Sequence, residues 1–244
     1  MMVTVWTVFW VALFTALANG LGALPFFFIR QFSRSWIGIF NAAAAGMMLG
    51  ASIGLINEGV EASLGLLILG SLAGLFIILF LNGRLEHNHE ASQNIMRTGG
   101  GLRGFLIVSV MTIHSFAEGI GIGVAYGGDA KLGAFIAAAI AIHNIPEGLA
   151  VSLVLVPRGT SPFRATLWSI FTALPQPLMA VPAFLFVLFF RPFLPFGLGL
   201  AAGAMLWMVF SELIPDALQE TDHNLVGIVV TLALTLMITM QALL

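Results

Sequence analysis

Cysteine is absent from this sequence of 244 residues, and charged residues are scarce. Without a thiol, the chain can form no disulfide and can offer no thiolate to a metal ion. Asp, Glu, Lys and Arg together make up 8% of the residues, whereas soluble domains carry roughly a quarter. The mean hydropathy is +1.05, and 59% of the residues are hydrophobic. These values exclude an ordinary soluble domain and predict an integral membrane protein.

Three further absences narrow the class of protein. The formal net charge is −2, so the chain lacks the basic surface that a nucleic-acid partner would require. The nucleotide-binding pattern Gly-x-x-x-x-Gly-Lys-Ser/Thr does not occur, so ATP is not expected to drive the protein. The first residues lack the basic region of a cleavable signal peptide, so the first hydrophobic segment is expected to be retained.

The sequence does contain long, uninterrupted hydrophobic runs. Each extends over about 20 residues, the length of a membrane-crossing helix, and none shows the short alternating segments of a membrane β-barrel. The chain has room for about eight such helices. We therefore predict an all-α integral membrane protein in which residues 1–244 form a single transmembrane domain. The predicted helices cover about 3–29, 36–56, 62–81, 106–124, 132–156, 164–190, 194–218 and 225–244.

The distribution of Lys and Arg predicts how the chain is oriented. With eight crossings, the odd-numbered loops carry seven of the nine basic residues. Such an excess marks the cytoplasmic side, so both termini are expected outside the cytoplasm of a plasma membrane or bacterial inner membrane. The polar stretch at about 84–103 then forms a short cytoplasmic loop. Its histidines, His87 and His89, are most simply part of a solvated linker.

One short pattern, His-x-x-x-Glu-Gly, occurs twice within the hydrophobic sequence, beginning at His114 and at His143. Residues four apart lie on one face of a helix, so each copy directs an imidazole and a carboxylate, Glu118 or Glu147, the same way. Ionisable side chains are costly within a bilayer and usually face the protein interior. Interhelical hydrogen bonding would explain one such pair. Two copies at the same spacing favour a functional site.

The chemistry of these side chains suits a divalent transition metal. Imidazole and carboxylate together fit zinc and other borderline divalent metals, such as iron, manganese, cobalt and nickel. Two carboxylates formally neutralise one divalent ion, which makes a loaded site tolerable at low dielectric. The two motifs therefore predict a metal site that contains His114, Glu118, His143 and Glu147.

The second motif reads His-Asn-Ile-Pro-Glu-Gly over residues 143–148. The chain resembles the ZIP (Zrt/Irt-like protein) metal transporters, particularly their bacterial GufA-type branch. The features that carry this resemblance are this motif, its weaker copy, the eight expected helices and the polar loop after the third helix. The resemblance covers essentially the whole chain. It implies a 3+2+3 arrangement in which the first three and the last three helices are related by an inverted repeat. It also implies that Asn144, and Met48 on the second helix, are ligands at the same centre.

Two residues depart from the family's pattern. Ser115 stands where many members have asparagine after the first histidine, and Gln176 stands where they usually have a glutamate before proline. Both positions belong to a second, adjacent metal site in members that bind two ions. Gln176 can still bind a metal through its carbonyl oxygen but supplies no charge. We therefore expect one tightly held metal per chain.

The predicted function is the transport of a divalent metal into the cytoplasm, without enzymatic activity. Zinc is the expected substrate, and iron, manganese, cobalt and cadmium are further candidates. A membrane metalloenzyme is an alternative, but a pattern such as His-Glu-x-x-His is absent. A proton or anion channel that uses the same His/Glu cluster is the other alternative. The expected partners are the metal and the lipid bilayer; a homodimer is considered, although the residues do not fix the oligomeric state.

Overall fold

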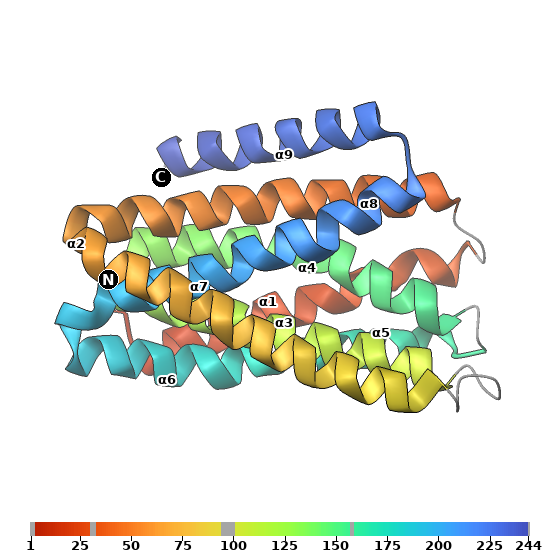
Figure 1. Cartoon of the computed structure of the whole chain (residues 1–244), viewed down its shortest axis with the longest axis horizontal. Coiled ribbons are helices and arrows are strands. Elements are labelled where there is room, and N and C mark those ends of the chain that lie inside the picture. The colour runs from red at the N-terminus through yellow and green to blue at the C-terminus, as the bar shows by residue number, and fades with distance from the viewer. Residues whose placement is uncertain (1–2, 30–32, 94–100, 157–158, 244) are drawn as a thin grey trace.

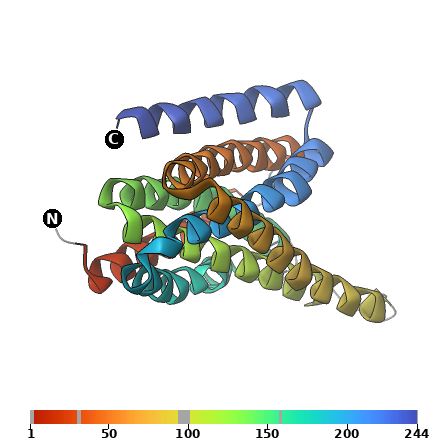
Figure 2. The same ribbon diagram turned by 60° about the vertical axis from the view of Figure 1, so that its left-hand side comes forward.

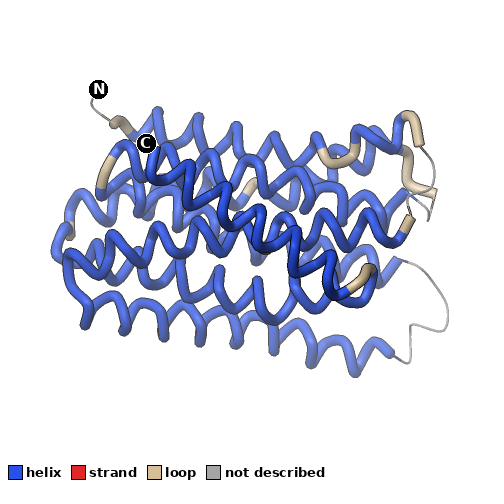
Figure 3. The backbone as a smooth tube through the Cα atoms, turned by 90° about the horizontal axis from the view of Figure 1, so that it is seen from above, coloured by secondary structure: helices blue, strands red, loops and turns tan. Residues whose placement is uncertain are grey.

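The computed structural model describes residues 3–29, 33–93, 101–156 and 159–243. All regular structure in this part of the chain is helical, which confirms the predicted fold class (Figure 3). The long helices run side by side, and α1 begins at the same end of the bundle at which α9 ends, on the left in Figure 1. The α-helices are α1 (Val5–Leu21), α2 (Arg34–Gln93), α3 (Gly101–Gly128), α4 (Ala130–Leu155), α5 (Pro162–Ala173), α6 (Pro175–Phe189), α7 (Leu194–Met208), α8 (Ile214–Glu220) and α9 (His223–Leu243). Short 3-10 turns, η1 (Leu24–Phe27) and η3 (Arg191–Phe193), and a π-helical turn, η4 (Val209–Leu213), complete the described elements.

Short polar side chains set the start of several helices. Thr4 and Thr7 form a capping box at the start of α1. Asp129 accepts hydrogen bonds from the first backbone N–H groups of α4, and Asp222 does the same for α9. Ser161 caps α5, whose first residue is a proline. These side chains satisfy backbone donors that have no partner within the first helical turn.

Six helical stretches among the described residues are long and apolar enough to cross a membrane. The longest, Ser35–Phe80, lies in α2 and is interrupted at Ser63, where φ is −169° and ψ is 104°. This break divides α2 into two arms that fold back on each other, orange and yellow in Figure 1. With α3, which has 28 residues, the arrangement is compatible with eight crossings. The count of eight, the 3+2+3 order and the inverted repeat stay predictions.

The stretch 84–103 is more helical than a simple polar loop. α2 continues to Gln93 and α3 begins at Gly101, so helix extends into both ends of this stretch. Leu, Glu, Ala and Gln, which occur here, favour helix even where the sequence is polar. The side chains of His87 and His89 lie outside the part of the chain that the structure describes.

The helices pack as two groups. The first group is α1, α3, α4, α5 and α6, and the second is α2, α7, α8 and α9, of which α9 lies outermost against the first arm of α2 (Figure 2). A Cβ atom at Gly70 or Gly74 of α2, or at Gly199 or Gly203 of α7, would lie 2.0 to 2.2 Å from a backbone oxygen of the facing helix. Small residues permit this close approach, on which helix association in lipid depends. Contacts of α2 with α4 and of α3 with α7 join the two groups.

Candidate metal centre

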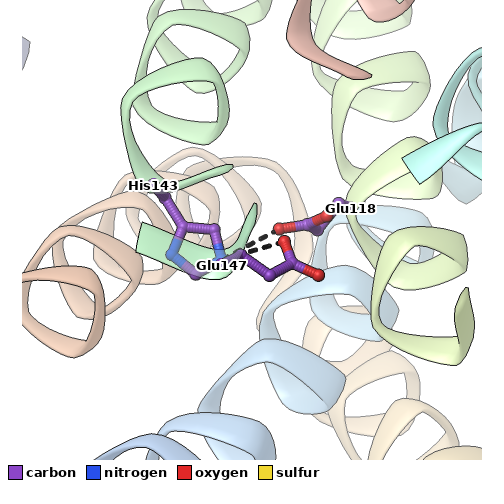
Figure 4. Close-up of side chains that lie close together, drawn as sticks. All are labelled: Glu118, His143 and Glu147. Atoms are coloured by element: carbon purple, nitrogen blue, oxygen red, sulfur yellow. Dashed lines mark ion pairs between the residues drawn. The ribbon is translucent and has the colours of Figure 1, made fainter. Parts of the chain in front are cut away.

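The two sequence motifs meet in the buried interior between α3 and α4. Glu118 comes from α3, and His143 and Glu147 come from successive turns of α4 (Figure 4). Each side chain offers one ligand atom, and the three atoms lie within 4.8 Å of one another. All three side chains are buried. This spacing is close to that of ligands around a single ion, because zinc–nitrogen and zinc–oxygen bonds are about 2 Å long.

The facing atoms of this cluster are close together but do not form hydrogen bonds. Nε2 of His143 lies 3.1 Å from Oε1 of Glu118 and 3.9 Å from Oε2 of Glu147. Among the described residues, neither His143 Nε2, nor Glu118 Oε1, nor either carboxylate oxygen of Glu147 has a hydrogen-bond partner. A buried polar atom without a partner costs about 1–3 kcal/mol, and a charged one costs more. A cation between these atoms would supply the missing interaction.

A hydrogen-bond network fixes the other side of Glu118. Gln176 Nε2 donates to Glu118 Oε2 at 2.7 Å, while Gln176 Oε1 accepts from Thr15 Oγ1 at 2.7 Å. Asn144 Nδ2 donates to Gln176 Oε1 at 3.1 Å and to the backbone oxygen of Thr15 at 2.7 Å. All four side chains are buried. The network holds Glu118 with its second oxygen facing His143.

The structure also shows the surroundings of the other positions that the resemblance indicated. Both ends of the Gln176 amide are engaged, so this side chain positions Glu118 in the observed arrangement. Asn144 Oδ1 is buried without a hydrogen-bond partner in the described chain, and so is Ser115 Oγ. Met48 is buried on α2, in the core that also contains Ala117 of the first motif. Metal ligation by Gln176, Asn144 and Met48 stays a prediction.

His114 lies beside the cluster and faces the second helix group. Its ring is stacked on that of His143, with centroids 6.2 Å apart and an angle of 21° between the planes. Its Nδ1 atom lies 3.5 Å from Oε2 of Glu212, whose side chain is 21% exposed. Glu212 belongs to the π-helical turn η4, a type of element that is frequent at functional sites. An imidazole and then a carboxylate thus lead from the cluster toward a less buried position.

Each motif ends in a glycine because another helix crosses there. A Cβ atom at Gly119 would lie 2.5 Å from the backbone oxygen of Gln176, and one at Gly148 would lie 1.7 Å from the backbone oxygen of Asn19. The first contact brings α6 against the turn that carries Glu118. The second brings α1 against α4. Without this close approach, the side chains of α1 and α6 would not reach the cluster.

Thr15 and Glu212 were not selected as site residues from the sequence. Thr15 is one of two threonines in the hydrophobic helix α1, and nothing in the pattern around it distinguishes it. Glu212 precedes Asp216 by four residues near the end of a hydrophobic run, where a solvated acidic residue is the ordinary expectation. Their positions depend on which helices become neighbours.

Facing ligand atoms of two buried carboxylates and one imidazole, without hydrogen-bond partners among the described residues and inside a bundle of membrane-length helices, define a membrane protein suited to bind divalent cations. Over residues 81–239 the chain matches the family described as ZIP Zinc transporter. The chain therefore belongs to the ZIP zinc transporter family, as the resemblance predicted. Because this family consists of zinc transporters, the predicted class of divalent-metal transporter rather than enzyme is confirmed.

Three curated relatives illustrate the similarity. A putative zinc transporter of Arabidopsis thaliana is 47% identical in an alignment of 233 residues that covers 93% of this chain. The chain spans only 38% of the length of that plant protein. Zinc transporter GufA of Myxococcus xanthus is 30% identical over 84% of this chain and 86% of its own length. Zinc transporter ZIPB of Bordetella bronchiseptica is 31% identical over 85% of this chain and 70% of its own length.

Proposed function

We propose that the protein moves a divalent metal ion, zinc in the first place, into the cytoplasm through the cluster of Glu118, His143 and Glu147. The observation that carries this proposal is the convergence of buried ligand atoms without hydrogen-bond partners. A purely structural polar cluster would satisfy its donors and acceptors. The names of the relatives support zinc, and iron, manganese, cobalt and cadmium are further substrates to test. Residues 1–244 act as one transmembrane transporter domain.

The proposed ligand set follows from which atoms remain available. The core cluster provides two carboxylates and one imidazole. Asn144 contributes its unpaired Oδ1, and His114 joins by turning from Glu212 toward the ring on which it is stacked. Gln176 would have to give up existing hydrogen bonds before its oxygen could bind a metal. In order of support, the ligands are Glu118, His143, Glu147, Asn144, His114, Met48 and Gln176.

The charge of the centre favours one metal per chain. Glu118 and Glu147 carry at most two negative charges, and the neighbouring Gln176 and Asn144 are neutral. Two adjacent divalent ions would bring four positive charges into a buried site, and the repulsion at low dielectric calls for about as much opposing charge. A second ion would therefore be held weakly.

A relative movement of the two helix groups provides the translocation step. The core ligands stand on α3 and α4 of the first group, whereas Met48 and Glu212 stand on elements of the second. Movement of one group against the other would carry a bound ion past different residues of its neighbour. Glu212, partly exposed and 3.5 Å from His114, would then offer the ion its first ligand outside the buried cluster.

Flux measurements on purified protein in liposomes test this function. Zinc should accumulate in vesicles that contain the protein at a rate well above that of empty vesicles, with iron, manganese, cobalt and cadmium compared under the same gradient. A proton or anion current that persists after all metal has been chelated, without metal uptake, would instead identify a channel. Metal-dependent turnover of a lipid or peptide would identify an enzyme.

We further propose that both termini face away from the cytoplasm of a plasma membrane or bacterial inner membrane; a homodimer is the assembly to be tested. The absence of cysteine allows single Cys probes. Ser33→Cys, before α2, should be protected from a membrane-impermeant thiol reagent in intact cells, and Ala130→Cys, at the exposed start of α4, should react. The opposite pattern would invert the orientation. A mass of one chain in native membrane nanodiscs would contradict the dimer.

A further inference from the structure

The outer face of α5 carries a hollow of about 320 Å³ that plays no part in the metal centre. It is lined by Arg164, Leu167, Trp168 and Phe171. These positions follow one another at steps of three, one and three residues, so they share one face of the helix. All four side chains are exposed, and the rings of Trp168 and Phe171 meet edge to face at 5.5 Å. The hollow is therefore lined by aromatic and aliphatic side chains and by one cationic group.

Arg164 has no ion-pair partner within the part of the chain that the structure describes. Its backbone N–H is hydrogen-bonded to the Ser161 side chain at the start of α5. Its guanidinium takes part in none of the ion pairs among the described residues. A guanidinium presents a planar fork of donors that matches two oxygens of a phosphate group. The structure thus places an unpaired phosphate-binding group at the edge of an apolar hollow.

The hollow also lies at the right depth for a lipid headgroup. Arg164 is the third residue of the membrane-length stretch Pro162–Phe189, so it stands near one end of a crossing. Trp168, one turn further in, is the type of residue that gathers just inside the membrane–water interface. In the proposed orientation this end faces the cytoplasm, where anionic lipids are concentrated.

We propose that this hollow binds an anionic phospholipid. The phosphate pairs with Arg164, and the upper part of an acyl chain lies on Leu167, Trp168 and Phe171. A protein partner fits less well, because four side chains of one helix are far fewer than the roughly 20–30 residues per side of a stable protein interface. The lipid satisfies both features of the hollow with one molecule.

The bound lipid would act on the helix that supports the metal centre. The opposite face of α5 is buried, and there Ser169 Oγ donates to the backbone oxygen of Gly148 at 3.2 Å. Gly148 directly follows Glu147 in the second motif. A lipid that holds α5 in place therefore stabilises the position of this motif, and zinc uptake should be slower in vesicles without anionic lipid. This consequence, unlike the binding itself, rests on the proposed function.

Fluorescence quenching tests the binding independently of transport. The other four tryptophans, Trp6, Trp10, Trp36 and Trp207, are replaced by phenylalanine, which leaves Trp168 as the only indole. Quenching is measured in vesicles that contain phosphatidylglycerol or phosphatidylcholine with brominated acyl chains. One basic residue near an anionic surface favours binding on the order of fivefold. We expect this preference for phosphatidylglycerol in the parent, its loss with Arg164→Gln and an intermediate value with Arg164→Lys.

Arg191→Gln is the matched control, because Arg191 is an exposed arginine just beyond the other end of the same crossing. It should leave the preference at Trp168 unchanged. Equal quenching by the two lipids, or an undiminished preference in Arg164→Gln, would overturn the proposal. Relief of quenching by millimolar inorganic phosphate would show that Arg164 binds free phosphate instead, which would also overturn it. Gel filtration and a retained Trp168 emission maximum show that each variant is folded.

Discussion

The polar atoms of the candidate metal centre are of two kinds. Glu118 Oε2 and both ends of the Gln176 amide form hydrogen bonds, and these bonds fix the geometry. The other Glu118 oxygen, His143 Nε2 and the Glu147 carboxylate face one another and have no hydrogen-bond partner in the described part of the chain. Ligand atoms need free lone pairs, and the groups that orient them lie one layer further out. The centre has both layers.

Gln176→Glu tests how charge limits the number of metals. The new carboxylate would lie where Gln176 now donates to Glu118 at 2.7 Å, and two carboxylates this close cannot both ionise without a cation between them. We expect the variant to bind metal more tightly by about tenfold or more, because one added charge at about 4 Å interacts strongly with the ion at reduced dielectric. We also expect it to bind a second ion and to transport metal more slowly. Calorimetry and elemental analysis of purified protein measure both effects.

Gln219→Glu is the control for this substitution, because Gln219 is exposed on α8. It adds the same charge to the chain and should leave metal affinity and stoichiometry unchanged. Two tightly bound metals in the unsubstituted protein would contradict the charge argument, since the missing carboxylate would then be replaced by another group.

The repeated motif made part of the centre predictable. Glu118, His143 and Glu147 recur at a helical spacing, and the structure brings these three together. Thr15 and Glu212 reach the site from helices that are distant in sequence. A pattern within one helix indicates which face is polar but does not indicate which other helix will cover it. The identity of the covering helix depends on how the glycines pack, and this packing can be interpreted only once the neighbouring helices are known.

At the scale of helices, close backbone approach determines which elements adjoin the site. Gly148 lets α1 pack against α4, and Gly119 lets α6 pack against α3. In lipid, helices gain little from burying apolar side chains, so van der Waals contact across such small residues contributes much of the attraction. A side chain at these positions would separate the helices that carry the hydrogen-bond network from those that carry the ligands.

Gly148→Ala tests this role of the motif glycine. Its new Cβ would lie 1.7 Å from the Asn19 backbone oxygen, and such overpacking destabilises a core by about 1–3 kcal/mol or more. We expect a lower thermal unfolding midpoint in detergent and slower zinc uptake, although every ligand is retained. Gly65→Ala is the comparison, since a Cβ atom at this position of α2 would meet no facing atom of the described chain within 4 Å. It should be neutral or stabilising by up to about 1 kcal/mol; equal midpoints would contradict the account.

The break in α2 shows what hydrophobic runs do and do not predict. The sequence predicted two crossings separated near Asn57-Glu58-Gly59, and the structure interrupts the helix at Ser63. The existence of two arms followed from length, because a hydrophobic stretch of 46 residues in one helix exceeds a bilayer about twofold. The position of the break did not follow from the length of the stretch, because a helix continues through polar residues where their backbone groups stay paired. The extension of α2 to Gln93 has the same cause.

At the scale of the molecule, the division into two helix groups gives the proposed transport step a structural basis. The three residues of the candidate cluster stand on the first group, and the second provides the surface along which it would move. The sequence predicted membrane helices and their class of protein. It did not predict this division, because contacts between distant helices depend on three-dimensional packing that hydropathy does not encode.

A disulfide between the groups tests whether they move. A Cβ atom at Gly121 of α3 would lie 3.5 Å from the Cβ atom of Ala201 of α7, within the range that a disulfide requires. Gly121→Cys combined with Ala201→Cys, oxidised in membranes, should lose most zinc uptake, and a reductant should restore it. The chain's lack of cysteine excludes other pairings within it. Full uptake by the cross-linked protein would contradict movement at the contact of α3 with α7.

The central claim is that metal passes through the cluster of Glu118, His143 and Glu147, and the zinc uptake rate of His143→Ala and Glu147→Ala in liposomes tests it most directly. Loss of a residue that merely supports a ligand costs about 10–100-fold in affinity or activity, so loss of a ligand should reduce uptake at least tenfold. Glu61→Ala, which removes an exposed carboxylate, should retain the full rate. Uptake at the unsubstituted rate by His143→Ala or Glu147→Ala, with equal amounts of folded protein inserted, would contradict the account.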